Sequence, residues 1–432
     1  MTALSWAAVA VFVTAYVFIA AEWVHRVTAA LAGAVVMLLI GVTNAHHAFF
    51  SGDAGIDWNV IVLLVGMMLQ VAVLKRTGLF EYLAIWAAKR ARGRPFRVMV
   101  ILVLVTAVVS AALDNVTTVL LVAPVTFLVC QRLGVPVAPF LIAEVMASNI
   151  GGTATLVGDP PNIIIGSRSG LTFNQFLTVL GPFIAVVLMV FVLLCRWLFR
   201  AAFRYDPARA AEVSTLREQD AITDRRLLVV SLVVLAGVLA AFVGHTTLGL
   251  EPSVVALSGG LLLVALSRLD PAELARDVEW PTLVFFAGLF VMVGALVNTG
   301  AIAALADQAS HAIGGDLWLG AMVLLWASAG LSAIIDNIPY VATMSPIVEQ
   351  LVAGAPANEP GQVLWWALAL GADLGGNATA VGASANVVVL GLAAKAGSPI
   401  SFWQFTRYGV VVAAITVALA VPYLYLRFFA FS

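Results

Sequence analysis

Long apolar segments follow one another along almost the whole chain, and this feature limits the fold more than any other. Several are only 16 to 19 residues long, which at about 1.5 Å per residue just spans a membrane core of roughly 30 Å. Hydrophobic residues make up 62% of the 432 residues and charged residues 10%, against about 45–50% and about 25% in soluble domains. A soluble protein this apolar could not cover its own surface. The sequence therefore predicts an all-α polytopic membrane protein.

The apolar segments fall into crossings and hairpins. We expect about ten transmembrane helices, near residues 3–21, 27–42, 58–74, 138–166, 173–198, 227–244, 250–267, 280–298, 362–394 and 408–428. Two further segments, 97–132 and 317–352, each contain two apolar stretches joined by a polar tip, Asp114-Asn115 or Asp336-Asn337. A charge at the centre of a lipid-facing helix costs about 2.5–3.5 kcal/mol. We therefore predict two re-entrant hairpins whose tips face a polar cavity.

The basic residues predict the orientation. In this layout 20 of the 22 Lys and Arg residues lie in loops on one side, and only Arg168 and Arg427 lie on the other. Basic loops stay in the cytoplasm, so the sequence predicts a multi-pass protein of the cell (inner) membrane with both termini outside. The charged stretch 200–226 is then a cytoplasmic linker.

Two polar motifs occur twice, once in each half of the chain. LDNVTTVLLVAPVT (113–126) matches IDNIPYVATMSPIV (335–348) at an offset of 222, and NIGGTATLVGDPPN (149–162) matches DLGGNATAVGASAN (373–386) at an offset of 224. We therefore predict an N-terminal repeat, 1–199, and a C-terminal repeat, 227–432, whose spans 138–166 and 362–394 are broken helices. Each half has five crossings and one hairpin. Because five is an odd number, the second repeat starts on the opposite side of the membrane and is inverted relative to the first. Inverted repeats with interrupted helices are typical of secondary transporters, which bind their cargo near the midplane.

The repeated motifs supply the candidate binding residues. Glycine pairs let a helix unwind, and the freed backbone groups are tolerable only where they line a cavity. The predicted substrate-binding residues are Asn115, Thr117, Thr118, Asn149, Gly151, Gly152, Thr153, Asn337, Gly375, Gly376, Asn377 and Thr379. The alternative is that small residues only pack helices closely, which explains poorly why the motifs occur twice.

Four acidic residues lie at or near the breaks, and we predict that they couple ions or protons: Asp114, Asp159, Asp336 and Asp373. No Lys or Arg falls in the central part of any segment, which predicts a site without a fixed cation. Such a site favours a cation or an uncharged polar solute over a multiply charged anion. The alternative for each aspartate is a helix N-cap. Asp159, which precedes Pro160-Pro161, fits that alternative best.

At these motifs the sequence resembles the ion transporter superfamily, in particular the ArsB/NhaD group. LDNVTTVLLVAP, NIGGTATLVGDPPN and DNIPYVATMSP carry the resemblance, which covers nearly the whole chain. The group includes arsenite-efflux permeases, sodium/proton antiporters and the P-protein branch, and is related to dicarboxylate symporters. The resemblance implies an elevator-like motion, a homodimer and, in some arsenite pumps, a separate ATPase subunit. Dicarboxylate symporters typically show Ser-Asn-Thr at the hairpin tips, where this chain has Asp114 and Asp336.

These observations order the candidate functions. The chain has no G-x-x-x-x-G-K-[ST] motif for ATP hydrolysis, no CxxC pair, and no catalytic or metal-binding set, so we expect no enzyme activity, cofactor or metal, and no nucleic acid partner. The first hypothesis is proton-coupled efflux of arsenite or antimonite. The alternative is sodium/proton antiport, and a sodium-coupled dicarboxylate symporter is third. A passive channel is disfavoured by the closed hairpins.

Overall fold

The fold consists of helices packed side by side. The computed structural model describes residues 2–21, 23–52, 54–209, 217–355 and 360–430, and in these ranges the chain forms helices and turns and no strand. Seven of the described helices are long and apolar enough to cross a membrane, and six shorter apolar helices accompany them. The predicted class, an all-α polytopic membrane protein, is confirmed.

The helices follow the same order in both halves of the chain. The first half contains α1 (Ala3–Ala20), α2 (Arg26–Leu39), α3 (Ala45–Phe50), α4 (Trp58–Lys75), α5 (Leu79–Arg90), α6 (Pro95–Ala112), α7 (Asn115–Leu133), α8 (Ala138–Gly152), α9 (Pro160–Ser169) and α10 (Phe173–Leu198). The second half contains α12 (Arg225–Leu248), α13 (Pro252–Ser267), α14 (Pro271–Arg276), α15 (Trp280–Asn298), α16 (Ala301–Ile313), α17 (Leu317–Ser332), α18 (Asn337–Ala353), α19 (Val363–Gly375), α20 (Ser384–Lys395) and α21 (Phe402–Phe428). Between the halves lie the 3-10 turns Arg200–Ala202 and Glu218–Ala221, and linker residues 210–216 fall outside the described residues.

Matching local signals start matching helices. Gly78 and Gly300, which are 222 residues apart, precede α5 and α16 with φ of 77° and 72°. Only glycine adopts this left-handed conformation readily. At the same offset α4 and α15 begin at Trp58 and Trp280. The helix order thus agrees with the sequence repeat, while the inverted orientation of the two halves in a bilayer stays a prediction.

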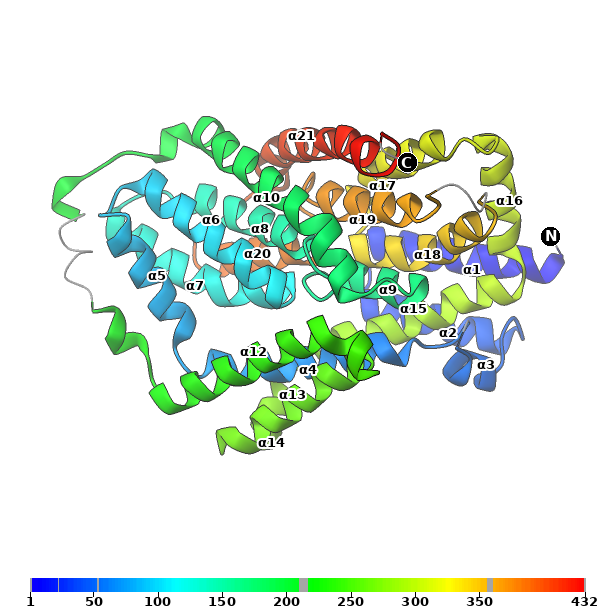
Figure 1. Cartoon of the computed structure of the whole chain (residues 1–432), viewed down its shortest axis with the longest axis horizontal. Coiled ribbons are helices and arrows are strands. Elements are labelled where there is room, and N and C mark those ends of the chain that lie inside the picture. Colours follow the sequence, from blue (N-terminus) through cyan, green and yellow to red (C-terminus); the bar gives the residue numbers. More distant parts are fainter. Residues whose placement is uncertain (1, 22, 53, 210–216, 356–359, 431–432) are drawn as a thin grey trace.

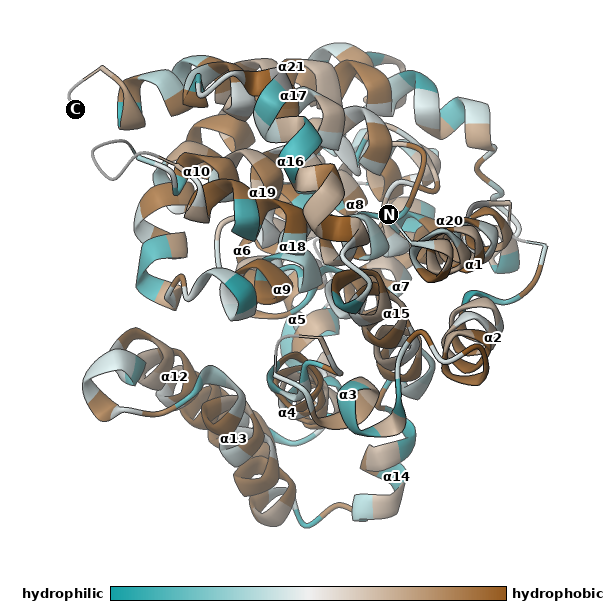
Figure 2. Cartoon of the chain, turned by 90° about the vertical axis from the view of Figure 1, so that its right-hand side faces the viewer, coloured by the Kyte–Doolittle hydropathy of each residue, from teal (hydrophilic) through white to brown (hydrophobic). Residues whose placement is uncertain are grey.

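The helices pack into two groups. In the first group, which we call the scaffold group, α4 packs on α13, α2 on α15, α12 on α13 and α1 on α2. In the second, the hairpin group, α6 packs on α8, α17 on α19, α20 on α7 and α8, and α18 on α9. Figure 2 shows α12 and α13 below the hairpin group when the molecule is viewed end-on. The groups meet where α15 contacts α18 and where α4 contacts α9.

The two helix pairs that carry the polar tips approach from opposite ends of the molecule (Figure 1). The pair α6–α7 lies at the end that also carries α5, and α17–α18 lies at the end that carries α16 and the N-terminus. The tips are the short breaks between Ala112 and Asn115 and between Ser332 and Asn337. Both tips therefore point toward the middle of the molecule, where the candidate site lies.

Candidate functional site

Two spans lose their helical conformation in the middle of the hairpin group. Helix α8 ends at Gly152 and α9 begins at Pro160, whereas α19 ends at Gly375 and α20 begins at Ser384. An unwound segment leaves backbone carbonyls without helical partners, and these must be satisfied inside the protein.

Asparagine side chains satisfy part of this demand. Asn386 Nδ2 donates to the carbonyls of Gly376 at 2.9 Å and Thr379 at 2.8 Å. In the first half Asn162 Nδ2 donates to the carbonyl of Thr155 at 3.0 Å. Sequence reasoning missed both asparagines as site residues, although each closes the repeated 14-residue motif.

Threonines tie each break to the neighbouring hairpin tip. Thr155 Oγ1 donates to the carbonyl of Ala111 at 2.6 Å, and Thr379 Oγ1 donates to that of Ala333 at 2.5 Å. Thr153 donates to the carbonyl of Asn149 in its own helix at 2.8 Å, and its predicted contact with substrate stays a prediction. The repeat thus builds the same joint between hairpin and broken span twice.

The predicted glycines bring backbones close together. A Cβ atom at Gly151 would collide with the backbone of Ala107 on α6, and one at Gly375 would collide with that of Ala329 on α17. Gly152 and Gly376 face the carbonyls of Gly158 and Gly382 across their own breaks in the same way. Close helix packing accounts for the position of these glycines, and their contact with a cargo stays a prediction.

A buried network of amides and carboxylates joins the two halves. We call it the central cluster, and it comprises Asn115, Asn149, Asp159, Asn162, Asn337, Asp373, Asn377 and Asn386. Asn149 Nδ2 donates to Asn377 Oδ1 at 3.0 Å and to Asn386 Oδ1 at 3.1 Å, and so crosses from the first half to the second. Asn115 Nδ2 donates to Asn149 Oδ1 at 3.1 Å and to Asp159 Oδ2 at 2.9 Å. Every member is at most 2% exposed, so the hairpin tips and the broken spans meet in a fully enclosed site.

Asp159 does not act as a helix cap, which was the alternative to its predicted role in ion or proton coupling. It stands at the N-cap position of α9, but its side chain makes no capping hydrogen bond. Two prolines follow it, and proline has no N–H to offer in the first turn. The carboxylate accepts a hydrogen bond from Asn115 instead, so the N-cap alternative does not hold for this residue, and its role in ion or proton coupling stays a prediction.

Several oxygen acceptors of the central cluster have no donor. Both carboxylate oxygens of Asp373, Oδ1 of Asp159, and the amide oxygens of Asn115 and Asn162 are buried without a hydrogen-bond partner among the described residues. Asp159 and Asp373 lie close enough for their charges to interact. Water or a cation can satisfy buried acceptors of this kind, and a proton can neutralise the carboxylates.

The hairpin-tip aspartates act as helix caps. Asp114 Oδ1 accepts from the backbone N–H of Thr117 at 2.8 Å, and Asp336 Oδ1 accepts from that of Ile338 at 3.1 Å. Thr118, next to Thr117, is buried and its hydroxyl has no partner among the described residues. Both aspartates therefore cap the helix that follows, and their predicted role in ion or proton coupling stays a prediction.

A fixed cation does reach the site, contrary to the expectation. Arg26, at the start of α2 in the scaffold group, places Nη1 3.6 Å from Asp336 Oδ2 and donates to Ser384 Oγ at 2.6 Å. Ser384 in turn donates to Asp336. Sequence reasoning placed Arg26 in a loop, because nothing in the linear pattern shows that this loop touches the second hairpin tip.

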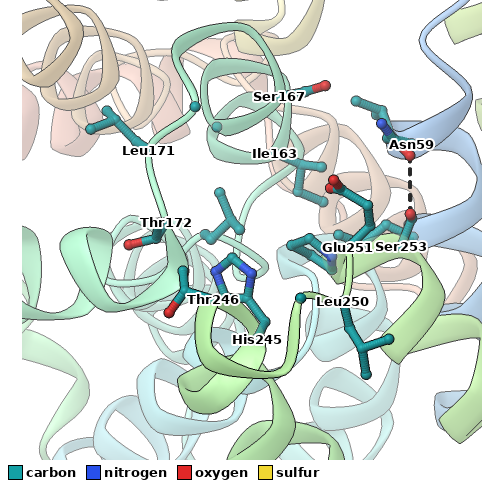
Figure 3. Close-up of a pocket in the computed structure, with 17 residues that line it drawn as sticks. Asn59, Ile163, Ser167, Leu171, Thr172, His245, Thr246, Leu250, Glu251 and Ser253 are labelled. Atoms are coloured by element: carbon teal, nitrogen blue, oxygen red, sulfur yellow. Dashed lines mark hydrogen bonds between the residues drawn. The ribbon is translucent and has the colours of Figure 1, made fainter.

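Two cavities are lined by residues of both helix groups. One, of about 550 Å³, lies between α4, α9 and the α12–α13 loop, and Figure 3 shows His245, Glu251 and Ser253 around it. Ser253 Oγ donates to Asn59 Oδ1 at 3.1 Å. The other, of about 530 Å³, is lined by Arg26, Asp336 and Ser384. The second cavity reaches a hairpin tip, whereas the cavity of Figure 3 contains no member of the central cluster.

Within the described ranges, no group of three or more His, Cys, Asp or Glu residues is placed to hold a metal ion. The central cluster offers carboxylate and amide oxygens instead. These are ligands that hard cations prefer.

Comparison with known proteins decides the family. The sequence profile described as "Citrate transporter" (CitMHS) matches residues 16–371. The chain belongs to this family. An uncharacterized transporter of Mycobacterium tuberculosis is 56% identical over 422 residues, which cover 98% of each chain. The P protein of Mus musculus is 34% identical over 495 residues, covering 96% of this chain and 59% of that longer protein.

Solved structures agree on the fold. The MtrF protein of Neisseria gonorrhoeae superposes with a TM-score of 0.61 at 12% identity, covering 92% of this chain and 85% of its own. The predicted resemblance to the ArsB/NhaD-like superfamily is confirmed, including its P-protein branch. This member of the CitMHS family is therefore a multi-pass membrane transporter.

Proposed function

We propose that this protein is a secondary active transporter that exchanges protons for a small cation such as sodium at the central cluster. The observation that carries the proposal is the pair Asp159 and Asp373. Each comes from a different half of the chain and is completely buried. Three of their four oxygens accept no hydrogen bond of ordinary geometry among the described residues, although Thr153 and Asn162 lie near Asp373 and Asn337 lies near Asp159. Two neighbouring buried carboxylates cannot both stay charged without compensation. Either protons or a cation must neutralise the two carboxylates. Because protons and the cation compete for the same acids, the movement of one is coupled to the movement of the other.

Efflux of arsenite or antimonite, which the sequence placed first, is the second candidate. One observation favours it. The amide donor Asn377 Nδ2 is buried without an acceptor among the described residues. Such a donor suits the hydroxyl oxygens of uncharged arsenous acid. The carboxylate pair would then carry the driving protons.

A citrate cargo, which the family description names, has weaker support in the charges. A tricarboxylate at the central cluster would approach Asp159 and Asp373. Among the described residues at the hairpin tips, the cation that could offset this repulsion is Arg26, and it is already paired with Asp336. A sodium-coupled dicarboxylate symporter meets the same difficulty.

Reconstituted liposomes with a pH-sensitive dye inside separate these cargoes. Sodium, arsenite, antimonite and citrate are added one at a time across an imposed pH gradient. We expect sodium to drive proton movement in the wild type. In Asp159→Asn and Asp373→Asn this flux should fall by about 100-fold, equivalent to about 2.7 kcal/mol.

The matched control is Asp270→Asn, because Asp270 is exposed and caps α14, and asparagine caps equally well. A proton response to arsenite without any response to sodium would establish the second candidate instead. If the protein takes up citrate and Asp159→Asn leaves this uptake unchanged, both the cation exchange and the arsenite efflux proposals are contradicted.

A further inference from the structure

Glu144 is a buried acid that lies outside the central cluster. It sits within α8, is 3% exposed, and has the completely buried Ala143 and Val145 as neighbours in the chain. Its hydrogen bond joins Oε1 to Thr126 Oγ1 at 2.5 Å, while Oε2 is buried with no partner among the described residues. A carboxylate held by a single hydroxyl is poorly compensated at such a position.

The geometry around Thr126 suits a carboxyl that gains and loses a proton. Thr126 Oγ1 also lies 3.3 Å from the carbonyl oxygen of Val122, to which it can donate. A hydroxyl has one proton. When Thr126 donates to Val122, it can accept a hydrogen bond from a protonated Glu144, and when it rotates toward Glu144 it stabilises the charged form. The same pair of residues therefore serves both protonation states.

The helices packed against α8 bring few charges near Glu144. Their titratable and charged groups are Arg97 on α6, Cys130 and Arg132 on α7, Cys195 and Arg196 on α10, Asp373 on α19, and Lys395 on α20. Of these, Cys130 lies close enough for its charge to interact with Glu144, and it is completely buried. A neighbour of that kind supplies no positive charge, so the proton itself has to neutralise Glu144.

Polar groups lead from Glu144 to the central cluster. Ser148 follows one helical turn later on the same face of α8, a rise of about 6 Å. Its hydroxyl contacts Ser110 Oγ at 3.1 Å and donates to the carbonyl of Asn115 at 3.0 Å. The side chain of Asn115 donates to Asp159. The loop before α8 lies at the linker, because a Cβ atom at Gly134 would meet the side chain of Arg209. Glu144 therefore stands between this end of α8 and the acid pair.

The second half of the chain has no acid in the equivalent place. At the repeat offsets of 224 and 222, Glu144 corresponds to Leu368 and Thr126 to Val348, and both are completely buried. The fold thus accommodates an apolar pair at this joint, and packing does not require a carboxyl group. The acid is therefore present in the first half of the chain and has no counterpart in the second.

From this geometry we propose that Glu144 is a second proton-binding site, which relays protons between the linker end of α8 and the pair Asp159 and Asp373. The proposal rests on the proposed proton coupling. The relay serves the side of the membrane that the linker faces, because its counterpart in the other half is apolar. Glu144 contacts no cargo and acts on the protons that the central cluster exchanges.

Two measurements test the relay. Infrared difference spectroscopy of the purified protein follows the C=O band of protonated carboxyl groups as the pH is raised, and Glu144→Gln should remove one titrating band. In liposomes, Glu144→Gln and Glu144→Leu should slow sodium-driven proton flux by at least about tenfold. Sodium binding without a pH gradient should stay within about twofold of wild type, since the acid pair is intact. Glu81→Gln, exposed on α5, is the control and should match wild type in both assays.

The outcomes separate this proposal from the proposed function. If the wild type shows no sodium-driven proton flux, the proposed function fails, and the infrared band still decides whether Glu144 holds a titrating proton. If Glu144→Gln keeps both the band and the wild-type flux, the relay is wrong while the acid pair stands. Glu144→Leu, which reproduces the apolar residue of the other half, guards against misfolding of the glutamine variant.

Discussion

The two hairpin tips have the same architecture but different charges. Asp114 and Asp336 stand 222 residues apart, and each caps the helix that follows. Asp336 also faces Arg26 at 3.6 Å. Arg26 is the first residue of α2, and the matching helix of the second half, α13, begins with the uncharged Pro252. The second tip is therefore tied to the scaffold group by an ion pair, and the first tip is not.

The two breaks, between α8 and α9 and between α19 and α20, also share their architecture but differ in the positions of their charges. Asp159 corresponds to Ala383, and Asn149 corresponds to Asp373, at an offset of 224. Each half thus contributes one carboxylate to the central cluster, but from opposite sides of its break. The glycine pairs and the threonines Thr155 and Thr379 repeat because they build the joint, whereas the two acids of the central cluster and Arg26 do not repeat. The comparison teaches that the repeat supplies the architecture and that its departures supply the chemistry.

The largest effect on stability is expected where the halves agree. Gly151→Ala and Gly375→Ala would each push a methyl group into the backbone of the facing helix, which should destabilise the protein by about 2–3 kcal/mol. The matched control is Gly330→Ala in α17, where a Cβ meets open space. Alanine there should be neutral or stabilising. Thermal unfolding in detergent micelles measures all three, and unequal losses at Gly151 and Gly375 would break the equivalence of the two joints.

An intermediate effect is expected where the halves differ. Arg26→Met leaves Asp336 without its cation, and the side chains of this pair are 33% and 16% exposed. We expect a loss of about 1–2 kcal/mol, between the values for exposed and buried ion pairs. Adding Asp336→Asn should recover most of it, because asparagine keeps the cap and removes the charge. A double-mutant cycle read by thermal unfolding gives the coupling energy, and strict additivity would show that the pair contributes nothing.

The smallest effect is expected at an ion pair outside the membrane-spanning helices. Lys89 Nζ on α5 donates to Glu218 Oε2 at 2.5 Å, and this hydrogen bond lowers the pKa of Glu218. A carboxyl whose pKa is lower in the folded than in the unfolded protein stabilises the fold at any pH above its unfolded-state pKa. This stabilisation is lost as the pH falls through the folded-state pKa. Glu218→Gln should therefore lower the Tm slightly at neutral pH and leave it unchanged in acid. A loss as large as that of Arg26→Met would remove the contrast between the two ion pairs.

The sequence predicted most of the architecture and part of the site. Apolar runs predicted the helices, and the repeated motifs predicted that Asn115, Asn149 and Asp373 lie at the breaks. Side-chain direction could not be predicted. Whether Asp159 caps α9 or turns to Asn115 depends on a contact 44 residues away in the chain. Arg26 was missed for the same reason, since its partner Asp336 belongs to the other half.

Proton release on sodium binding shows whether the pair Asp159 and Asp373 exchanges protons for a cation. Purified wild-type protein in weakly buffered detergent solution receives sodium, and a pH indicator records the protons set free. The account predicts release by the wild type and by Asp114→Asn, because asparagine still caps α7 and the acid pair is intact. It predicts no release by Asp159→Asn. Release by Asp159→Asn as in the wild type, with loss in Asp114→Asn, would show that the hairpin tip rather than the central cluster holds the exchanging acid.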